Sequence, residues 1–147
     1  MIFKNRLIKL DACPGAVEWV GDRDLKTAWA ECDRADWMLW YAARDKRVKR
    51  TTLVRAVCAC ARTALKYVPA GEDRPRLAIE AAERWAKRPT EKNKQAADAA
   101  YAAYAYAAAA ATYAANAAAA NAAYAYAAAA AAALRIMADI VRRFIKF

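Results

Sequence analysis

The sequence predicts an all-α fold: a compact multi-helix bundle closed by an alanine-rich helical hairpin. Three observations support this prediction. The 147 residues include only three Gly and four Pro, so residues that form turns are scarce. Strong helix formers, Ala above all, dominate the composition. Apolar residues also recur at helical spacing along most of the chain. Because the length suits one domain with its own core, we expect a single helical domain over residues 1–147.

Residues 1–22 are predicted to form an N-terminal arm. Residues 1–10 interleave cations with apolar side chains and are expected to be a short helix or an extended arm. Pro14 and Gly15 predict a chain break, and Gly21 predicts a second one before the first clear helical pattern. Trp19 lies between the two breaks and is expected to dock on the core.

Residues 23–90 are predicted to form tryptophan-rich helices. The first helix follows Asp24 and carries one apolar stripe, formed by Leu25, Ala28, Trp29 and Cys32. Asp33 is predicted to cap the second helix, with Asp36 in its first turn. Because both sides of this second helix are apolar, we expect it to be central and largely buried. Four tryptophans at helical spacing are expected to fill the core: Trp29, Trp37, Trp40 and Trp85.

Two further amphipathic helices are predicted before residue 90. The first spans about 49–68, and its inward face is predicted to hold Leu53, Val54, Val57, Ala61, Ala64, Leu65 and Val68. Pro69 ends this helix, and Asp73 can cap the next one. The inward stripe of that next helix is predicted to be Leu77, Ala78, Ala81, Ala82 and Trp85. Pro89 stops it, and Thr90 can cap a further helix.

Residues 91–147 are predicted to form an Ala/Tyr-rich hairpin and a C-terminal amphipathic helix. Of the 38 residues from 96 to 133, 28 are Ala, a composition that favours helix. One straight helix over residues 91–143 would be about 80 Å long, roughly twice the diameter of a compact domain of this size. We therefore expect a break, with Asn116 or Asn121 as the cap. Residues 134–147 are expected to form the closing amphipathic helix.

The composition argues against an enzyme. The chain has no His and no Ser, which excludes Ser-His-Asp triads and histidine bases, and it has no glycine-rich phosphate loop. Its cysteines lack C-x-x-C spacing and are expected to be small buried apolar residues, with no metal and no cofactor: Cys13, Cys32, Cys58 and Cys60. The first residues lack the apolar run of a signal peptide, so we expect a cytoplasmic protein.

A run of cations is the most distinctive surface feature, in a chain of formal net charge +10. Asp45 is the one acidic residue within it. The candidate partner-binding residues are Arg44, Lys46, Arg47, Lys49, Arg50, Arg55, Arg62 and Lys66. This set, which we call the cationic stripe, is continued in sequence by Arg84, Lys87 and Arg88. It is interpreted either as a surface for an acidic partner or as an ordinary solvated face.

Other patterns have structural interpretations. The 36 residues from 99 to 134 carry no charge, but residues 99–133 lack Leu, Ile, Phe and Val, so we expect no membrane span. The segment around Thr112 resembles alanine-rich helical antifreeze proteins, although it does not repeat its Thr. Carboxylates three apart are expected to be ordinary surface groups paired with arginines or placed at caps: Asp33 with Asp36, and Glu80 with Glu83.

An ordered set of motifs resembles the immunity proteins of the immunity-5-like family. The set comprises Ala28-Trp29, Cys32, Asp36-Trp37, Trp40, Cys60-Ala61-Arg62, Asp73-Arg74-Pro75, Ala78-Ile79-Glu80, Ala82-Glu83, Trp85 and Ala138-Asp139-Ile140-Val141-Arg142. The likeness covers about residues 29–142, including the Ala-rich tract. It implies a bacterial or phage cytoplasmic protein that neutralises a cognate toxin by binding it. It implies no catalytic or toxin-contacting residue.

Three functional hypotheses follow. The first is a non-catalytic immunity-type inhibitor whose cationic stripe binds an acidic surface of a toxin. The second is a basic phage or bacterial protein that associates with nucleic acid or counters host defence through the same stripe. The third is ice binding by the Ala-rich tract. The partner, the host and the oligomeric state are not specified by these patterns.

Overall fold

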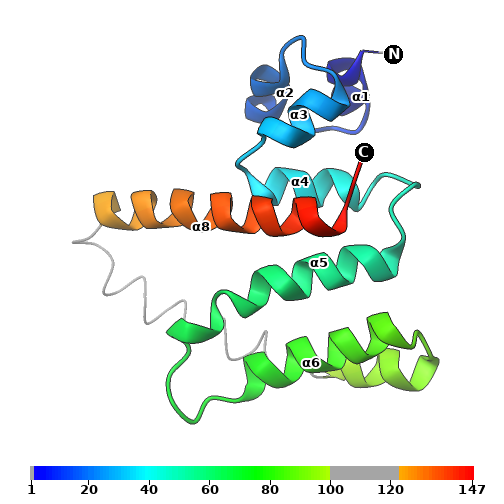
Figure 1. Cartoon of the computed structure of the whole chain (residues 1–147), viewed down its shortest axis with the longest axis vertical. Coiled ribbons are helices and arrows are strands. Elements are labelled where there is room, and N and C mark those ends of the chain that lie inside the picture. The colour runs from blue at the N-terminus through cyan, green and yellow to red at the C-terminus, as the bar shows by residue number, and fades with distance from the viewer. Residues whose placement is uncertain (1, 100–122) are drawn as a thin grey trace.

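The computed structural model describes residues 2–99 and 123–147, and the described residues form helices and no strand, as predicted (Figure 1). In chain order the elements are α1 (Phe3–Lys9), α2 (Pro14–Val20), α3 (Leu25–Glu31), α4 (Ala35–Ala42), α5 (Arg50–Arg62), the 3₁₀ turn η1 (Leu65–Tyr67), α6 (Arg74–Lys87) and α8 (Ala123–Phe144). Residues 91–99 are also helical. The predicted break at Asn116 or Asn121 lies outside the described residues, and so does the turn of the predicted hairpin.

The helices from α4 onward are stacked. Helix α8 contacts α4 on one side and α5 on the other, and α5 also contacts α6, so the layers follow the order α4, α8, α5, α6 (Figure 1). Small side chains allow this close approach, since Ala56 of α5 and Ala138 of α8 are fully buried. Helices α1, α2 and α3 gather beyond α4 (Figure 1). Both ends of the chain meet at Tyr41, whose ring lies 5.2 Å from that of Phe3 and 5.5 Å from that of Phe147.

Two helices begin with a side-chain cap, and the predicted cap at Thr90 is confirmed. The Asp24 carboxylate accepts a hydrogen bond of 2.7 Å from the backbone N–H of Thr27, which satisfies a free donor at the start of α3. This bond lowers the pKa of Asp24 below its usual value. The Thr90 hydroxyl accepts a bond of 3.3 Å from the backbone N–H of Asn93, where residues 91–99 turn helical.

The N-terminal arm is more ordered than predicted. Pro14 does not break the chain within a loop but starts α2, because its fixed φ suits the first turn and its missing N–H would have no partner there. Gly21 ends α2 with φ of +52°, a backbone conformation that favours glycine. Trp19 of α2 packs against the core, as predicted.

The predicted cap of α4 is wrong. Arg34, not Asp33, occupies the N-cap position, and no side chain caps this helix. Asp33 instead pairs with Arg135 of α8 at 3.2 Å. Its carboxylate thus has a tertiary partner that local sequence does not reveal. The helix itself is central, as expected, with Ala35, Met38 and Ala42 buried.

Helix α5 differs from the prediction in length and in its buried face. It ends at Arg62, and η1 follows, so residues 49–68 are not one α-helix. Val57 was predicted to face inward but is 42% exposed, while Ala56 is fully buried. The reason is that α5 has neighbours on two sides. The Cys58 thiol donates to the carbonyl of Ile79 in α6 at 3.8 Å, and the Cys60 thiol donates to that of Met137 in α8 at 3.6 Å.

Helix α6 shows a similar shift. Leu77 was predicted to face inward but is 46% exposed, and Ile79 is buried in the stripe instead. Asp73 holds the N-cap position, as predicted, but its carboxylate accepts from the Arg76 side chain at 3.1 Å rather than from the backbone. Which residues of α6 are buried therefore depends more on the position of the neighbouring helix α5 than on the size of the apolar side chains.

Helix α8 is one continuous helix that begins well before residue 134 and ends before the last three residues. Ile136 of this helix is 56% exposed, although its neighbours Ala138 and Val141 are fully buried. After the helix ends, Ile145 is buried, and its carbonyl accepts a bond of 3.1 Å from the Trp29 indole N–H. The Phe147 ring then contacts Trp29 edge-on at 4.6 Å. None of the helices in residues 2–99 and 123–147 has both the length and the apolar character to cross a membrane.

Candidate functional site

The structure exposes the whole cationic stripe. Four of its residues lie in the loop between α4 and α5, three lie on α5, and Lys66 lies in η1. All eight are exposed: Arg44, Lys46, Arg47, Lys49, Arg50, Arg55, Arg62 and Lys66. The stripe thus begins at the chain reversal after α4 and follows the next helix toward its C-terminal end.

The acidic residue of the stripe is buried beneath it. Asp45 is only 3% exposed, and its carboxylate accepts hydrogen bonds from Arg6 at 3.1 Å and from the Tyr41 hydroxyl at 2.9 Å. Arg47 adds bonds from Nε at 3.0 Å, from Nη2 at 2.7 Å and from its backbone N–H at 3.0 Å. The Arg47 bonds hold the pKa of the Asp45 carboxyl far below its usual range. The stripe therefore presents no carboxylate of its own at the surface.

Three arginines of the stripe lie over aromatic rings. The guanidinium carbon of Arg44 is 4.1 Å from the ring centre of Trp40, and that of Arg47 is 4.9 Å from Phe147. Arg55 lies 5.7 Å from the ring centre of Phe144. Such contacts restrict the guanidinium, and those of Arg44 and Arg55 leave its charge unneutralised, whereas Arg47 is also paired with Asp45. These arginines are thus partly ordered before any partner arrives.

A groove borders the stripe between α5, α6 and the end of α8. Its volume is about 540 Å³, and its lining comprises Arg55, Ala59, Arg62, Glu83, Ala86, Lys87 and Phe144. Arg62 forms two bonds of 2.7 Å with Glu83, which tie α5 to α6 and lower the pKa of the carboxyl. Lys87 extends the positive surface across the groove, as its position in sequence suggested. Ala59, Ala86 and Phe144 add apolar surface to the lining.

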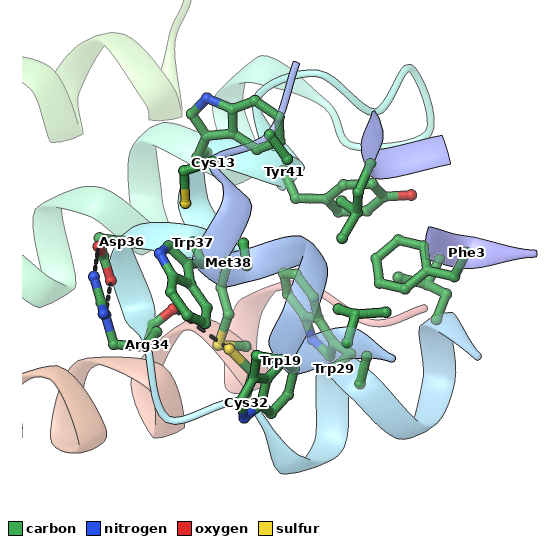
Figure 2. A pocket seen from close by; sticks show the side chains of 17 residues that line it. Phe3, Cys13, Trp19, Trp29, Cys32, Arg34, Asp36, Trp37, Met38 and Tyr41 are labelled. Atoms are coloured by element: carbon green, nitrogen blue, oxygen red, sulfur yellow. Dashed lines mark hydrogen bonds and ion pairs between the residues drawn. The ribbon is translucent and has the colours of Figure 1, made fainter. Parts of the chain in front are cut away.

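A second feature, which the sequence analysis missed, is a cavity of about 420 Å³ between α1, α2, α3 and α4 (Figure 2). We call it the tryptophan cavity. Seventeen residues line it: Phe3, Leu7, Ala12, Cys13, Ala16, Trp19, Val20, Leu25, Ala28, Trp29, Cys32, Arg34, Asp36, Trp37, Met38, Trp40 and Tyr41. Trp29 is buried, as predicted, but Trp37 and Trp40 are only half-buried. The sequence feature that could have indicated this cavity is the presence of four tryptophans between residues 19 and 40.

The charged groups of the cavity are paired with each other. Arg34 donates to Asp36 from Nε at 2.9 Å and from Nη2 at 2.6 Å, and the bonds lower the pKa of the Asp36 carboxyl. The same guanidinium lies 4.3 Å from the ring centre of Trp37. Figure 2 shows this pair on one side of the cavity, with Phe3 and Tyr41 on the other.

The cysteines differ in exposure. Cys13 is exposed at the tryptophan cavity, whereas the other three thiols are buried. Burial raises the pKa of Cys32 and Cys60 and brings that of Cys58 to about 11, so these thiols stay protonated near neutral pH. In the described part of the chain, no three Cys, Asp or Glu residues gather in a way that could hold a metal ion.

The carboxylates spaced three apart are paired with arginines, as predicted. The pairs are Asp33 with Arg135, Asp36 with Arg34, Glu80 with Arg76, and Glu83 with Arg62. Each carboxylate thus has a cationic partner of its own, and the two members of each sequence pair lie beside different arginines. This geometry matches surface ion pairing rather than two carboxyls that share a substrate.

The motifs that resemble the immunity-5-like family are spread over several helices. Trp29 and Ala138 lie in the core, whereas Trp37 lines the tryptophan cavity and Arg62 lies on the cationic stripe. The resemblance is thus carried by residues with different structural roles. Comparison of the chain with protein-family models, curated proteins and solved structures found no match.

Proposed function

We propose that this protein is a non-catalytic inhibitor of a partner protein, of the type that the resemblance to immunity proteins implies. It binds an acidic surface of the partner through the cationic stripe. The observation that carries the proposal is the burial of Asp45, which Arg6, Tyr41 and Arg47 hold beneath the stripe. Because Asp45 is buried, an approaching anionic surface meets no exposed carboxylate between residues 44 and 66, and Arg62 holds the neighbouring acid, Glu83.

Preorganisation supports this role. Binding is opposed by the loss of conformational freedom in the side chains at the interface. The long Lys and Arg side chains lose the most of this freedom. The contacts of Arg44 with Trp40, of Arg47 with Phe147 and of Arg55 with Phe144 restrict three of them in advance. Arginine is also enriched among the residues that dominate binding energy at protein interfaces.

The groove beside the stripe favours a protein partner over nucleic acid. Its lining combines the cations Arg55, Arg62 and Lys87 with apolar residues that include Ala59 and Phe144, and its one acid, Glu83, is paired with Arg62. A protein surface can offer both carboxylates and apolar side chains to such a groove. A nucleic-acid backbone offers mainly phosphates. We assign the protein to the cytoplasm of a bacterial or phage-infected cell, where its cysteines would remain reduced.

The first experiment uses the full chain to capture a partner from a lysate of the source cells, and the purified pair is then measured by calorimetry. The variant Lys49→Glu/Arg50→Glu reverses two stripe charges. Lys9→Glu/Lys26→Glu makes the same change in net charge at exposed sites outside the stripe. We expect the stripe variant to weaken binding by about a hundredfold and the control by less than about threefold. Equal losses in both variants would contradict the proposal.

Inhibition and partner class are tested separately. Co-expression with the captured protein should protect cell growth, and the stripe variant should protect less. A gel shift with duplex DNA and with single-stranded RNA tests the alternative. If nucleic acid binds and its affinity falls steeply with salt while no protein partner is recovered, the nucleic-acid hypothesis replaces this one.

A further inference from the structure

The tryptophan cavity has the size and lining of a small-molecule site. Its volume of about 420 Å³ falls within the range of protein ligand sites. The Trp19 and Trp37 rings have centres 6.2 Å apart and are tilted by 57°, so they meet at an angle and do not stack. Met38 adds a polarisable sulfur, which packs well against aromatic rings. Figure 2 shows these side chains gathered around the cavity.

The charges around the cavity are internally neutralised. Arg34 and Asp36 are the two lining residues that carry charge, and they form a closed bidentate pair. Nearby, Arg23 lies 4.9 Å from the Trp19 ring centre and pairs with Glu31 at 2.8 Å. A charged ligand would therefore lose water without gaining a free counter-charge. An uncharged ligand avoids this penalty.

From this geometry we propose that the tryptophan cavity binds a neutral aromatic small molecule. Water in the cavity finds few hydrogen-bonding partners, so its replacement by an aromatic ring is favourable. The lining includes the rings of Trp19, Trp37 and Phe3, and aromatic side chains suit offset or edge-on contacts with such a ring. The site lies among α1–α4, apart from the α5 portion of the cationic stripe, and the inference does not depend on the proposed function.

The probe for this test is N-phenyl-1-naphthylamine, and its matched control is 1-anilinonaphthalene-8-sulfonate, which has nearly the same rings and a negative charge. Binding is followed by probe fluorescence at about 0.5 M salt, which screens the exposed cations. We expect the neutral probe to bind with a dissociation constant on the order of tens of micromolar, about tenfold tighter than the anionic probe. No saturable binding of the neutral probe would overturn the proposal.

Two variants locate the probe. Cys13 is exposed at the cavity, so Cys13→Trp should fill the opening and abolish binding, whereas Cys13→Ser should retain it. Far-ultraviolet circular dichroism checks that both variants are folded. Equal binding of the neutral probe to both folded variants would place it elsewhere and overturn the proposal. Lys49→Glu/Arg50→Glu should bind the neutral probe like the unmodified protein, which separates this result from the fate of the proposed function.

A measurement on the unmodified protein makes the test independent of variant folding. N-ethylmaleimide should alkylate Cys13 much faster than the three buried thiols. Saturation with the neutral probe should slow this reaction about tenfold, because the ring blocks access to the thiol from the cavity. An unchanged alkylation rate at saturating probe would contradict the assignment.

Discussion

The Tyr41 hydroxyl donates a hydrogen bond of 2.9 Å to the carboxylate of Asp45, four residues later in the chain. Both side chains are buried, and the Tyr41 ring also contacts Phe3 and Phe147 from the two ends of the chain. The loop that begins the cationic stripe is therefore anchored to the point where the termini meet. Stability and the proposed binding surface depend on the same pair of side chains.

The first prediction concerns Asp45. Asp45→Asn removes a buried negative charge from beside Arg6 and Arg47 and should lower the free energy of unfolding by about 2 kcal/mol. Both arginines are partly exposed and can regain water, which limits the loss. Urea unfolding at neutral pH provides the measurement. Glu18→Gln, at an exposed acid, is the control and should change stability little.

The same carboxylate gives the protein a defined acid dependence. Because its pKa is depressed in the folded state, its contribution is present above the unfolded pKa of about 4 and is lost as pH falls toward the folded value. Between pH 7 and about pH 3, the unmodified protein should lose about 1 kcal/mol more than Asp45→Asn. Parallel pH profiles for the two proteins would rule out this account of Asp45.

The second prediction concerns Tyr41 at alkaline pH. Burial, aided by the hydrogen bond to Asp45 and its negative charge, raises the pKa of Tyr41 to about 12. Because the folded pKa is the higher one, the stability contributed by Tyr41 is complete below about pH 10 and is lost as pH rises through about 12. The stability difference between the unmodified protein and Tyr41→Phe should be constant to about pH 10 and then shrink. Denaturant unfolding across this range tests it, and a difference that stays flat above about pH 10 would refute the assignment.

The third prediction compares neighbouring residues of α5. Ala56 is fully buried and Val57 is 42% exposed, opposite to the order of their size. Ala56→Gln should destabilise the protein by about 3 kcal/mol, since it forces volume and an amide into a packed interior. Val57→Gln should change stability by less than about 0.5 kcal/mol. Thermal unfolding of the two variants provides the measurement. A larger loss of stability at Val57 than at Ala56 would support the inward face predicted from sequence.

The fourth prediction concerns the contact between α8 and the end of α3. Arg142 donates from Nη1 to the carbonyl of Trp29 at 3.1 Å and to that of Cys32 at 2.6 Å. These carbonyls end a helix and have no intrahelical partner. Arg142→Gln should therefore destabilise the protein by about 2 kcal/mol. Arg143→Gln, at an exposed neighbour, should have almost no effect, and similar losses in the two variants would be inconsistent with this role.

Local signals in the sequence identified some helix starts, at Asp73 and Thr90. The Asp24 and Thr90 side chains each accept a bond from a backbone N–H three residues later, so these caps depend on near neighbours in the sequence. The predicted cap at Asp33 is wrong because Arg135, 102 residues away, takes its carboxylate. The face predicted for α5 is right at Leu53, which packs against the core, and wrong at Val57, because a helix between two neighbours is buried on two sides and a single apolar stripe does not describe it.

The features of the candidate site were likewise predicted in part from sequence and revealed in part only by the structure. Composition and spacing alone determined that the chain is helical, strongly basic and without a histidine- or serine-based catalytic group, and they identified the eight cations of the stripe. Only the tertiary structure placed Arg6 against Asp45 and four of the five tryptophans around a cavity. Charge and helix propensity belong to residues and their near neighbours. The burial of a carboxylate and the shape of a cavity depend on side chains that folding brings together from distant positions.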